Sequence, residues 1–159
     1  MNKIANNDLQ DQHQFFMGKA IDLAKKAYDH AEVPVGAVLV QEGKVIVGEG
    51  WNQPISSCDP TAHAEVVAIR AACQNIGNYR LPGVTLYVTV EPCAMCAGAI
   101  IHGRISQLVF GALEPKSGVV KSQDSFFERG FLNHKVSCVS GVMAHEAAEL
   151  MQRFFQARR

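Results

Sequence analysis

Apolar positions recur along the chain with two periods, and their alternation predicts an α/β fold. From Asp8 to Ala31 they follow a spacing of three and four, which indicates an amphipathic helix. Two runs rich in valine and isoleucine, Val35 to Val40 and Val45 to Glu49, flank a short polar turn and predict a β-hairpin. Thr61 is then expected to cap a helix from Ala62 to Ile76. The first half is therefore predicted as helix, hairpin, helix.

The second half continues with alternating strands and helices. The β-branched run from Val84 to Val90 indicates a central strand, which Pro92 ends. Proline is tolerated in a first helical turn, so a helix is expected from Cys93 to His102 and a strand from Ile105 to Phe110. This order implies a right-handed crossover and a parallel strand pair. Three segments complete the prediction: a short helix Ser125–Glu128 within the long connection Gly111–His134, a strand Val136–Val142 and a final helix His145–Ala157.

Two short stretches carry candidate metal ligands. Cys93 and Cys96 are three residues apart, so at the start of a helix both thiols share one face and can bind one zinc ion, with His63 as a third ligand. Three ligands leave one tetrahedral position for water, which is typical of catalytic zinc. Glu65 lies two residues from His63, off the ligand face, and is expected to transfer protons. The alternative is a buried histidine with two structural thiols.

Composition and cysteine content fit one domain in a reducing compartment. The 159 residues are 48% hydrophobic, which suits a single domain over residues 1–159. No stretch approaches the roughly 18 apolar residues of a membrane span, and Met1–Gln14 lacks a signal-peptide pattern, so we expect a cytoplasmic protein with no membrane contact. Five cysteines, an odd number, do not suggest a disulfide framework. Cys73 and Cys138 are expected in the core. Cys58 lies in a polar loop, which favours a free thiol over a spare metal ligand.

The net charge of zero argues at first against a nucleic-acid partner. The charges are unevenly distributed, however, because the segment from Pro115 onward carries +3 and the rest of the chain −3. That asymmetry is compatible with a local surface that binds phosphate, although scattered basic residues also form ordinary solvated surface. Charge alone therefore does not decide the partner.

The metal motifs and their flanking residues resemble a known family. His63-Ala64-Glu65 followed by Pro92-Cys93-Ala94-Met95-Cys96 matches the signature of zinc-dependent nucleobase deaminases. Within the cytidine deaminase-like superfamily, the chain resembles the bacterial tRNA-specific adenosine deaminases almost from end to end. The stretches that carry this resemblance are Glu32–Val40, Gly48–Asn52, Asp59–Glu65, Asn78–Leu81, Glu91–Ala99, Val109–Ala112 and Asn133–His134. The resemblance implies a three-layer α/β/α cytidine deaminase-like fold with a five-stranded mixed sheet flanked by helices.

The resemblance also implies an activity and a set of site residues. The activity is zinc-dependent hydrolytic deamination of adenosine to inosine at the wobble position of a tRNA anticodon, by a homodimer with one Zn²⁺ per subunit. His63, Cys93 and Cys96 carry over as zinc ligands and Glu65 as the proton shuttle. Seven residues carry over as substrate contacts: Asn52 for the flipped nucleotide, Val33 and Val90 for the apolar pocket wall, and Lys116, Asn133, Phe155 and Arg158 for the anticodon stem-loop.

Two departures from the family pattern concern the long connection. Glu114 stands where the family commonly has aspartate, and Lys121–Asp124 replaces a stretch of the Gly-Ser-Leu-Met type. Both leave the predicted chemistry untouched, and both bear on which tRNA nucleotides are read. Two other functions stay open: deamination of a free base or nucleoside, which needs no basic surface, and a zinc-stabilised RNA-binding module without catalysis. Glu65 argues against the latter, because a structural site has no use for a carboxylate beside an incomplete ligand set.

Overall fold

The computed structural model describes the backbone of residues 2–159 and the side chains of residues 7–159. One mixed sheet has the strand order β2-β1-β3-β4-β5, with β1 antiparallel to β2 and β3, and with β3, β4 and β5 parallel to one another. The elements follow in this order: α1 (Asn2–Asp29), β1 (Gly36–Gln41), β2 (Val45–Trp51), α2 (Ala64–Ile76), β3 (Val84–Val90), α3 (Ala94–His102), β4 (Gln107–Ala112), the 3₁₀ turn η1 (Phe126–Glu128), β5 (Ser137–Val139) and α4 (Ala144–Gln156). The predicted five-stranded mixed sheet and its parallel pair are confirmed.

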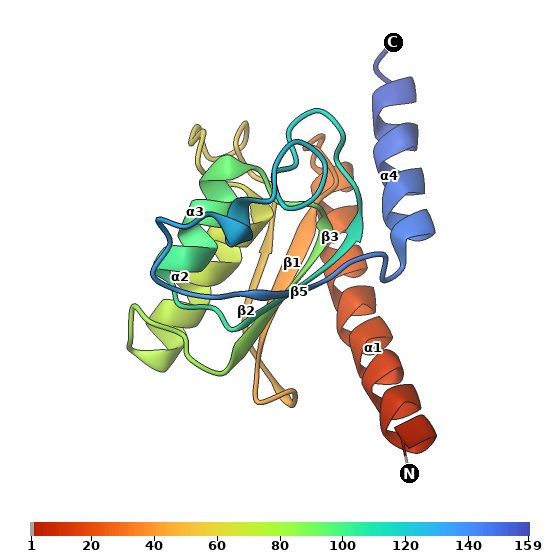
Figure 1. Cartoon of the computed structure of the whole chain (residues 1–159). Coiled ribbons are helices and arrows are strands. Elements are labelled where there is room, and N and C mark those ends of the chain that lie inside the picture. Colours follow the sequence, from red (N-terminus) through yellow and green to blue (C-terminus); the bar gives the residue numbers. More distant parts are fainter. Residues whose placement is uncertain (1) are drawn as a thin grey trace.

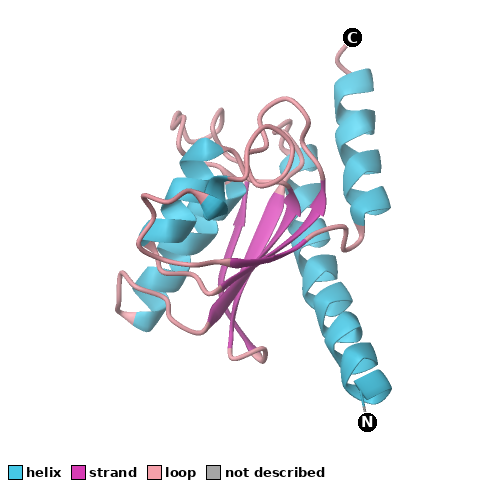
Figure 2. Cartoon of the chain, viewed as in Figure 1, coloured by secondary structure: helices cyan, strands magenta, loops and turns pink. Residues whose placement is uncertain are grey.

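The sheet lies between two helical layers, with α2 and α3 on one face and α1 and α4 on the other (Figures 1 and 2). Each face has its own apolar cluster. Ala68 of α2 and Ile100 of α3 belong to the first cluster, and Phe16 of α1 and Leu150 of α4 belong to the second. This is the predicted three-layer α/β/α arrangement.

The central strand β3 places the candidate site at one edge of the sheet. Six of its seven residues are buried, because helices cover both of its faces and it pairs with a strand on each side. Its carboxyl end leads through Glu91-Pro92-Cys93 into α3. In sheets of this kind, ligands bind outside the carboxyl ends of the parallel strands, where helices begin. The metal motifs lie at that edge.

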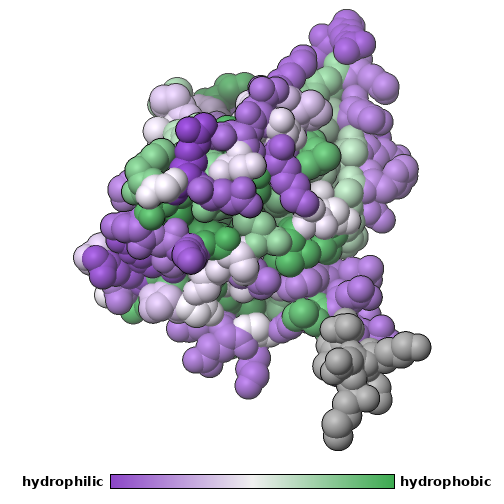
Figure 3. Space-filling view, viewed as in Figure 1, coloured by the Kyte–Doolittle hydropathy of each residue, from purple (hydrophilic) through white to green (hydrophobic). Residues whose placement is uncertain are grey.

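Helix α4 covers its face of the sheet with an apolar side. Ala147, Leu150 and Phe154 are buried at intervals of three and four residues. Its outward side is hydrophilic, and apolar residues run along the side that faces the body of the molecule (Figure 3, upper right). No helix in the described part of the chain is long and apolar enough to cross a membrane.

Two predicted elements differ from the structure by three residues or more at one end. Helix α1 begins at Asn2 rather than Asp8, since no proline or glycine interrupts the intervening residues, and Met1 lies outside the described residues. Strand β5 spans only Ser137–Val139, shorter than the predicted Val136–Val142. Because β5 is the edge strand and pairs only with β4, Cys138 is exposed and is not the core thiol expected from its apolar neighbours.

We expect Gly50→Ala to destabilise the fold by about 1–3 kcal/mol, the usual cost of overpacking. A Cβ at Gly50 would lie 2.5 Å from the carbonyl oxygen of Ala64 and 2.6 Å from the amide nitrogen of Ala68, so α2 would have to move off β2. Urea denaturation measures the change. Gly130→Ala in the long connection is the control, because a Cβ there meets nothing within 4 Å. Equal stability of the two variants would contradict close packing of α2 on β2.

Candidate active site

Two helix N-termini bring the three predicted metal ligands together. His63 is the N-cap residue of α2, Cys93 is the N-cap residue of α3, and Cys96 lies in the first turn of α3. Their ligand atoms lie within 4.8 Å of one another, and His63 Nδ1 is 3.6 Å from each sulfur. Tetrahedral zinc, with bonds of about 2.3 Å to sulfur and about 2.0–2.1 Å to nitrogen, requires nitrogen–sulfur separations of about 3.6 Å. The donor set therefore fits zinc in both chemistry and spacing.

The ionisation of the ligands also suits a cation. Hydrogen bonding from the Cys96 thiol lowers the pKa of Cys93 to about 4, so Cys93 is a thiolate at neutral pH. The hydrogen bond with Cys93 and burial raise the pKa of Cys96, because two adjacent thiols cannot both carry charge without a counter-ion. Hydrogen bonding to Cys93 raises the pKa of His63. A divalent cation removes the repulsion between the sulfurs and allows two thiolates.

Glu65 lies beside this cluster in the first turn of α2 and is only 4% exposed. It does not belong to the group of ligand atoms, as the sequence predicted. Burial raises the pKa of Glu65 to about 7, which is where a carboxyl group can both accept and return a proton at neutral pH. The arrangement is three ligands beside one buried acid/base group.

The residue that caps the N-terminus of α2 is not the predicted one. Thr61 is not its cap, because the helix starts at Ala64 and the Thr61 hydroxyl instead donates to Asp59 Oδ1 at 2.7 Å. The backbone N–H of Ala64 donates to Oδ1 of Asn52 at 2.8 Å. Asn52, at the end of β2, thus supplies from a distant strand the acceptor that a local cap was expected to provide.

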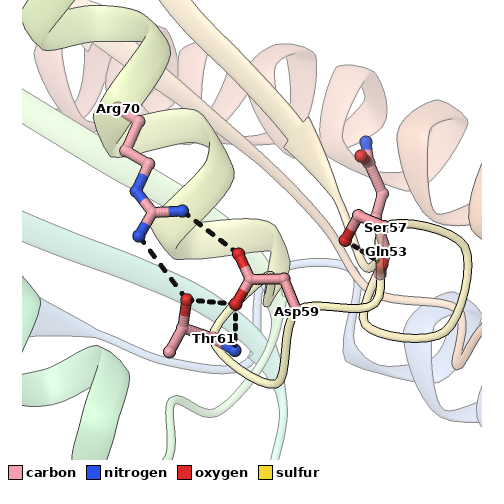
Figure 4. A network of polar contacts seen from close by, with 5 residues as sticks. All are labelled: Gln53, Ser57, Asp59, Thr61 and Arg70. Carbon is pink, nitrogen blue, oxygen red and sulfur yellow. Dashed lines mark hydrogen bonds and ion pairs between the residues drawn. The ribbon is translucent and has the colours of Figure 1, made fainter.

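The loop before His63 is fixed by a polar network (Figure 4). Asp59 Oδ1 accepts from the backbone N–H of Thr61 at 2.8 Å, and Arg70 on α2 approaches Asp59 Oδ2 at 3.4 Å. Hydrogen bonding from Thr61 lowers the pKa of Asp59, so the carboxylate is ionised at neutral pH. Cys58 lies in this loop, exposed and apart from the ligand group, so the spare-ligand interpretation is wrong for this structure.

A cavity of about 780 Å³ opens between the end of β4 and α4. Val90, three residues before Cys93, lines it together with Lys116, Phe155 and Arg158. Four of the seven predicted substrate contacts therefore share one cavity. Arg158 follows the end of α4 and is held against that helix: its guanidinium lies over the Phe154 ring, 3.4 Å from the centroid.

Three predicted substrate contacts lie outside this cavity. Asn52 lies at the N-terminus of α2, as described above, and the other two are Val33 and Asn133. Val33 is half-buried and packs against the core cluster on the α2 side of the sheet. Asn133 is exposed and accepts a hydrogen bond from Arg104, just beyond the C-terminus of α3. The zinc ligands are at the N-terminus of that nine-residue helix, about 13 Å away at 1.5 Å per residue. Asn133 is not among the residues that line the cavity between β4 and α4.

Sequence reasoning missed a role for Glu91. Its carboxylate is buried and accepts hydrogen bonds from the backbone of Glu114, Val120, Lys121 and Ser122. Burial would raise the pKa of Glu91, but these bonds and the one from the Ser122 hydroxyl hold it below its ordinary value. The sequence did contain a signal for this role, because Glu91 directly follows an apolar strand. A carboxylate buried at such a position requires hydrogen-bond partners.

Comparison with known proteins identifies the family. A family model of the cytidine and deoxycytidylate deaminase zinc-binding region matches residues 10–112, which include the three ligands and Glu65. A tRNA-specific adenosine deaminase of Haemophilus influenzae is 52% identical over 143 residues, which cover 90% of this chain and 83% of that protein. The chain belongs to the tRNA-specific adenosine deaminase family. It is a deaminase with the family's zinc-binding region, and His63, Cys93 and Cys96 within that region are positioned so that they could hold the metal.

Solved structures agree with membership of the tRNA-specific adenosine deaminase family. A tRNA:A34 deaminase, studied for A-to-I editing at the wobble position of transfer RNA, superposes with a TM-score of 0.83 and 44% identity over 86% of this chain and 98% of that one. A guanine deaminase from Bacillus subtilis has a TM-score of 0.62 and 33% identity over 92% of this chain and 93% of that one. The cytidine deaminase-like fold is confirmed. Since the same fold also serves a free base, the substrate has to be argued from the site.

Proposed function

We propose that this chain is a zinc-dependent deaminase, one domain over residues 1–159, that converts adenosine to inosine at the wobble position of a tRNA anticodon. The observation that carries the proposal is the buried Glu65 beside a three-ligand zinc site, in a chain 52% identical to a tRNA-specific adenosine deaminase. A structural zinc site is usually closed by four protein ligands and has no need of a buried acid/base group. Because its substrate is tRNA, we also expect the protein in the cytoplasm.

Glu65 moves the protons of the reaction. Zinc held by His63, Cys93 and Cys96 supplies a Lewis acid that lowers the pKa of water and provides a nucleophile at neutral pH. Glu65 accepts the proton that the water loses and delivers it to N1 of adenine, which makes C6 electrophilic. It then carries the second proton of the water to the departing amine, so adenosine and water become inosine and ammonia. The target base leaves its stack at least cost in a single-stranded loop such as an anticodon.

Asn52 orients the flipped nucleotide in this proposal. Its amide oxygen already accepts one hydrogen bond from Ala64, and we expect its amide nitrogen to be the donor that meets the nucleotide. We expect Asn52→Ala to weaken RNA binding and the single-turnover rate by about tenfold each, because one hydrogen bond to the nucleotide and one to α2 are lost. The rate at saturating RNA, with RNA affinity measured separately, checks this. An unchanged affinity and rate would remove Asn52 from the site.

The cavity between β4 and α4, which reaches Val90 three residues before Cys93, suits a nucleic-acid chain. It combines basic and apolar groups: Lys116, Arg158 and Arg159 can neutralise phosphates, and the half-exposed Phe155 offers a ring on which a base can stack. These groups lie on α4 and the long connection, within the part of the chain that carries +3. A deaminase of a free base would have no use for a basic cavity of this size outside its zinc pocket.

A homodimer accounts for Asn133 and for the surface of α3. Ala94 and Met95 are exposed on α3, next to a half-buried Gly98, and exposed apolar surface of this kind indicates an interface. We propose that two copies meet along α3 and that Asn133 of one chain contacts the RNA bound by its partner, because Asn133 does not line the cavity of its own chain. We therefore propose that both subunits contact the anticodon stem-loop.

We expect a dimer at micromolar concentration in sedimentation velocity, and a monomer when Met95→Glu puts a charge on the α3 surface. Ile55→Glu is the matched control, because Ile55 is 75% exposed on the loop after β2 and should leave the dimer intact. A monomeric wild-type protein with full activity would contradict the homodimer. So would a Met95→Glu variant that stays dimeric, since it would place the interface elsewhere.

Ammonia release separates this function from its rivals. The zinc-loaded protein is incubated with free bases, with free nucleosides and with an anticodon stem-loop that has adenosine at the wobble position. Release from the stem-loop alone, with inosine in the product, is the expected result. Release from guanine or cytosine indicates a free-base deaminase, and RNA binding without release from any substrate indicates a non-catalytic module.

A further inference from the structure

Glu91 is a buried carboxylate that the proposed reaction does not use. Its Oε1 accepts hydrogen bonds from the backbone N–H of Glu114 at 3.0 Å and from the Ser122 hydroxyl at 2.5 Å. Its Oε2 accepts from the backbone N–H groups of Val120, Lys121 and Ser122, at 3.1, 2.8 and 2.9 Å. These donors saturate the roughly four lone-pair sites of a carboxylate. Glu91 therefore has no capacity left to bind a metal, contact a substrate or relay a proton.

All of these donors belong to one segment, residues 114–122, which we call the 114–122 loop. The loop follows the carboxylate closely: a Cβ on Gly118 would lie 2.3 Å from Cδ of Glu91, so only glycine fits there. The backbone N–H of Val119 also donates to the carbonyl oxygen of Pro92 at 3.1 Å. The 114–122 loop is thus tied to Glu91 and Pro92, immediately before the zinc ligand Cys93.

The 114–122 loop also carries Lys116 to the cavity beside the zinc site. Lys116 lines this cavity together with Val90, the residue directly before Glu91, and with Phe155 of α4. Lys116 is exposed, and its backbone N–H donates only to the side chain of Glu114 within the same loop. Its place relative to the zinc site therefore depends on what anchors the loop: Glu91 accepts five hydrogen bonds from it, and the carbonyl oxygen of Pro92 accepts one.

We infer that Glu91 is a positioning residue for RNA binding: its carboxylate holds the 114–122 loop so that Lys116 meets the anticodon stem-loop beside the zinc site. This inference rests on the proposed function. It assigns Glu91 to the binding of RNA and not to the chemical step, because its oxygens are fully used within the protein. One short turn then serves two tasks, with Glu91 anchoring the RNA-facing loop and Cys93 binding the metal.

The test is the effect of Glu91→Gln on affinity and rate taken separately. Glutamine keeps the shape but has one acceptor oxygen, and its NH₂ group opposes the backbone donors of the 114–122 loop. The Kd for the anticodon stem-loop should rise about tenfold or more, as for a lost set of charge-assisted hydrogen bonds. The single-turnover rate at saturating RNA should stay within about threefold of the wild type, with zinc retained. Glu128→Gln is the matched control, because it removes the same charge from an exposed side chain of the long connection.

Coupling to Lys116 tests the pathway. If Glu91 acts by placing Lys116, the two substitutions remove the same interaction. The Kd of the Glu91→Gln/Lys116→Ala double variant should then stay within about twofold of the higher of the two single-variant Kd values. Fully multiplicative effects would overturn the inference. So would zinc loss, or a fall in rate at saturating RNA with unchanged Kd, because either result would assign Glu91 to the metal site or the chemistry.

Ser122→Ala decides the question if Glu91→Gln fails to fold. It removes one donor to Glu91, and its Kd should rise about two- to threefold with an unchanged rate at saturating RNA; no change in Kd would overturn the inference. The two proposals fail separately. A wild-type protein that does not deaminate the stem-loop contradicts the proposed function. If the wild type is active but Glu91→Gln and Ser122→Ala bind RNA as tightly as the Glu128→Gln control, only the role of Glu91 is contradicted.

Discussion

Glu65→Gln should lower the single-turnover rate of deamination by about 10⁴ or more while zinc and RNA remain bound. A general acid/base group contributes about 10²–10⁴ in rate, and Glu65 serves more than one transfer, so the loss lies at or beyond the top of that range. Glutamine matches glutamate in shape, and the carboxyl group is not among the metal ligands, so packing and zinc content should not change. The measurements are single-turnover rate at saturating stem-loop, zinc per chain and RNA affinity.

The matched control is Glu146→Gln. Glu146 also lies in the first turn of a helix, but it is exposed on α4 and away from the zinc site, so it reports any general effect of removing a first-turn charge. Its rate should equal that of the wild type. A Glu65→Gln variant that kept a tenth of the wild-type rate with zinc in place would show that Glu65 is not the proton shuttle, and the proposed mechanism would fail.

The chemistry of the site was predictable because it depends on local spacing. A strand followed at once by Pro92 starts a helix at Cys93, and any such helix places Cys93 and Cys96 on one face. The placement of His63 needed one further step, that helix N-termini gather at the carboxyl edge of the strands. The first condition holds for an isolated segment, so distant neighbours could not disturb it. The second depends on the strand order of the sheet, which the alternation of strands and helices predicted.

The errors arose where distant residues decide the local structure. Thr61 carries the usual signal of a helix cap, but Asp59 takes its hydroxyl and Asn52 from β2 supplies the acceptor for α2 instead. Glu91 bonds to backbone groups 23 to 31 residues further on, a pairing for which no short motif exists. Cys138 has apolar neighbours typical of a core strand, yet its exposure follows from the place of β5 at the sheet edge. Each of these depends on tertiary contacts that no periodicity encodes.

Cys93→Ser should lose zinc and activity together, whereas Cys58→Ser should keep one zinc per chain and the wild-type rate. Serine does not supply the thiolate that zinc requires, and the two remaining ligands, His63 and Cys96, do not hold the ion tightly. Cys58 is exposed on its loop, apart from the three ligand atoms, so its replacement removes a thiol without touching the site. Elemental analysis of both variants gives the zinc content, and the stem-loop assay gives the rate.

The loss of zinc should also appear as a loss of stability. An ion that binds only the folded chain stabilises it by about 2.7 kcal/mol at a free concentration of 100 times its Kd. For a chain of this size each kcal/mol corresponds to about 2–4 °C, so Cys93→Ser should lower the Tm by about 5–10 °C in zinc-containing buffer. Adding a chelator should lower the Tm of the wild type and of Cys58→Ser by a similar amount, but not that of Cys93→Ser. If Cys58→Ser lost the metal and Cys93→Ser kept it, the ligand assignment would be wrong, since His63 Nδ1 and the sulfurs of Cys93 and Cys96 would not be the three atoms that bind zinc.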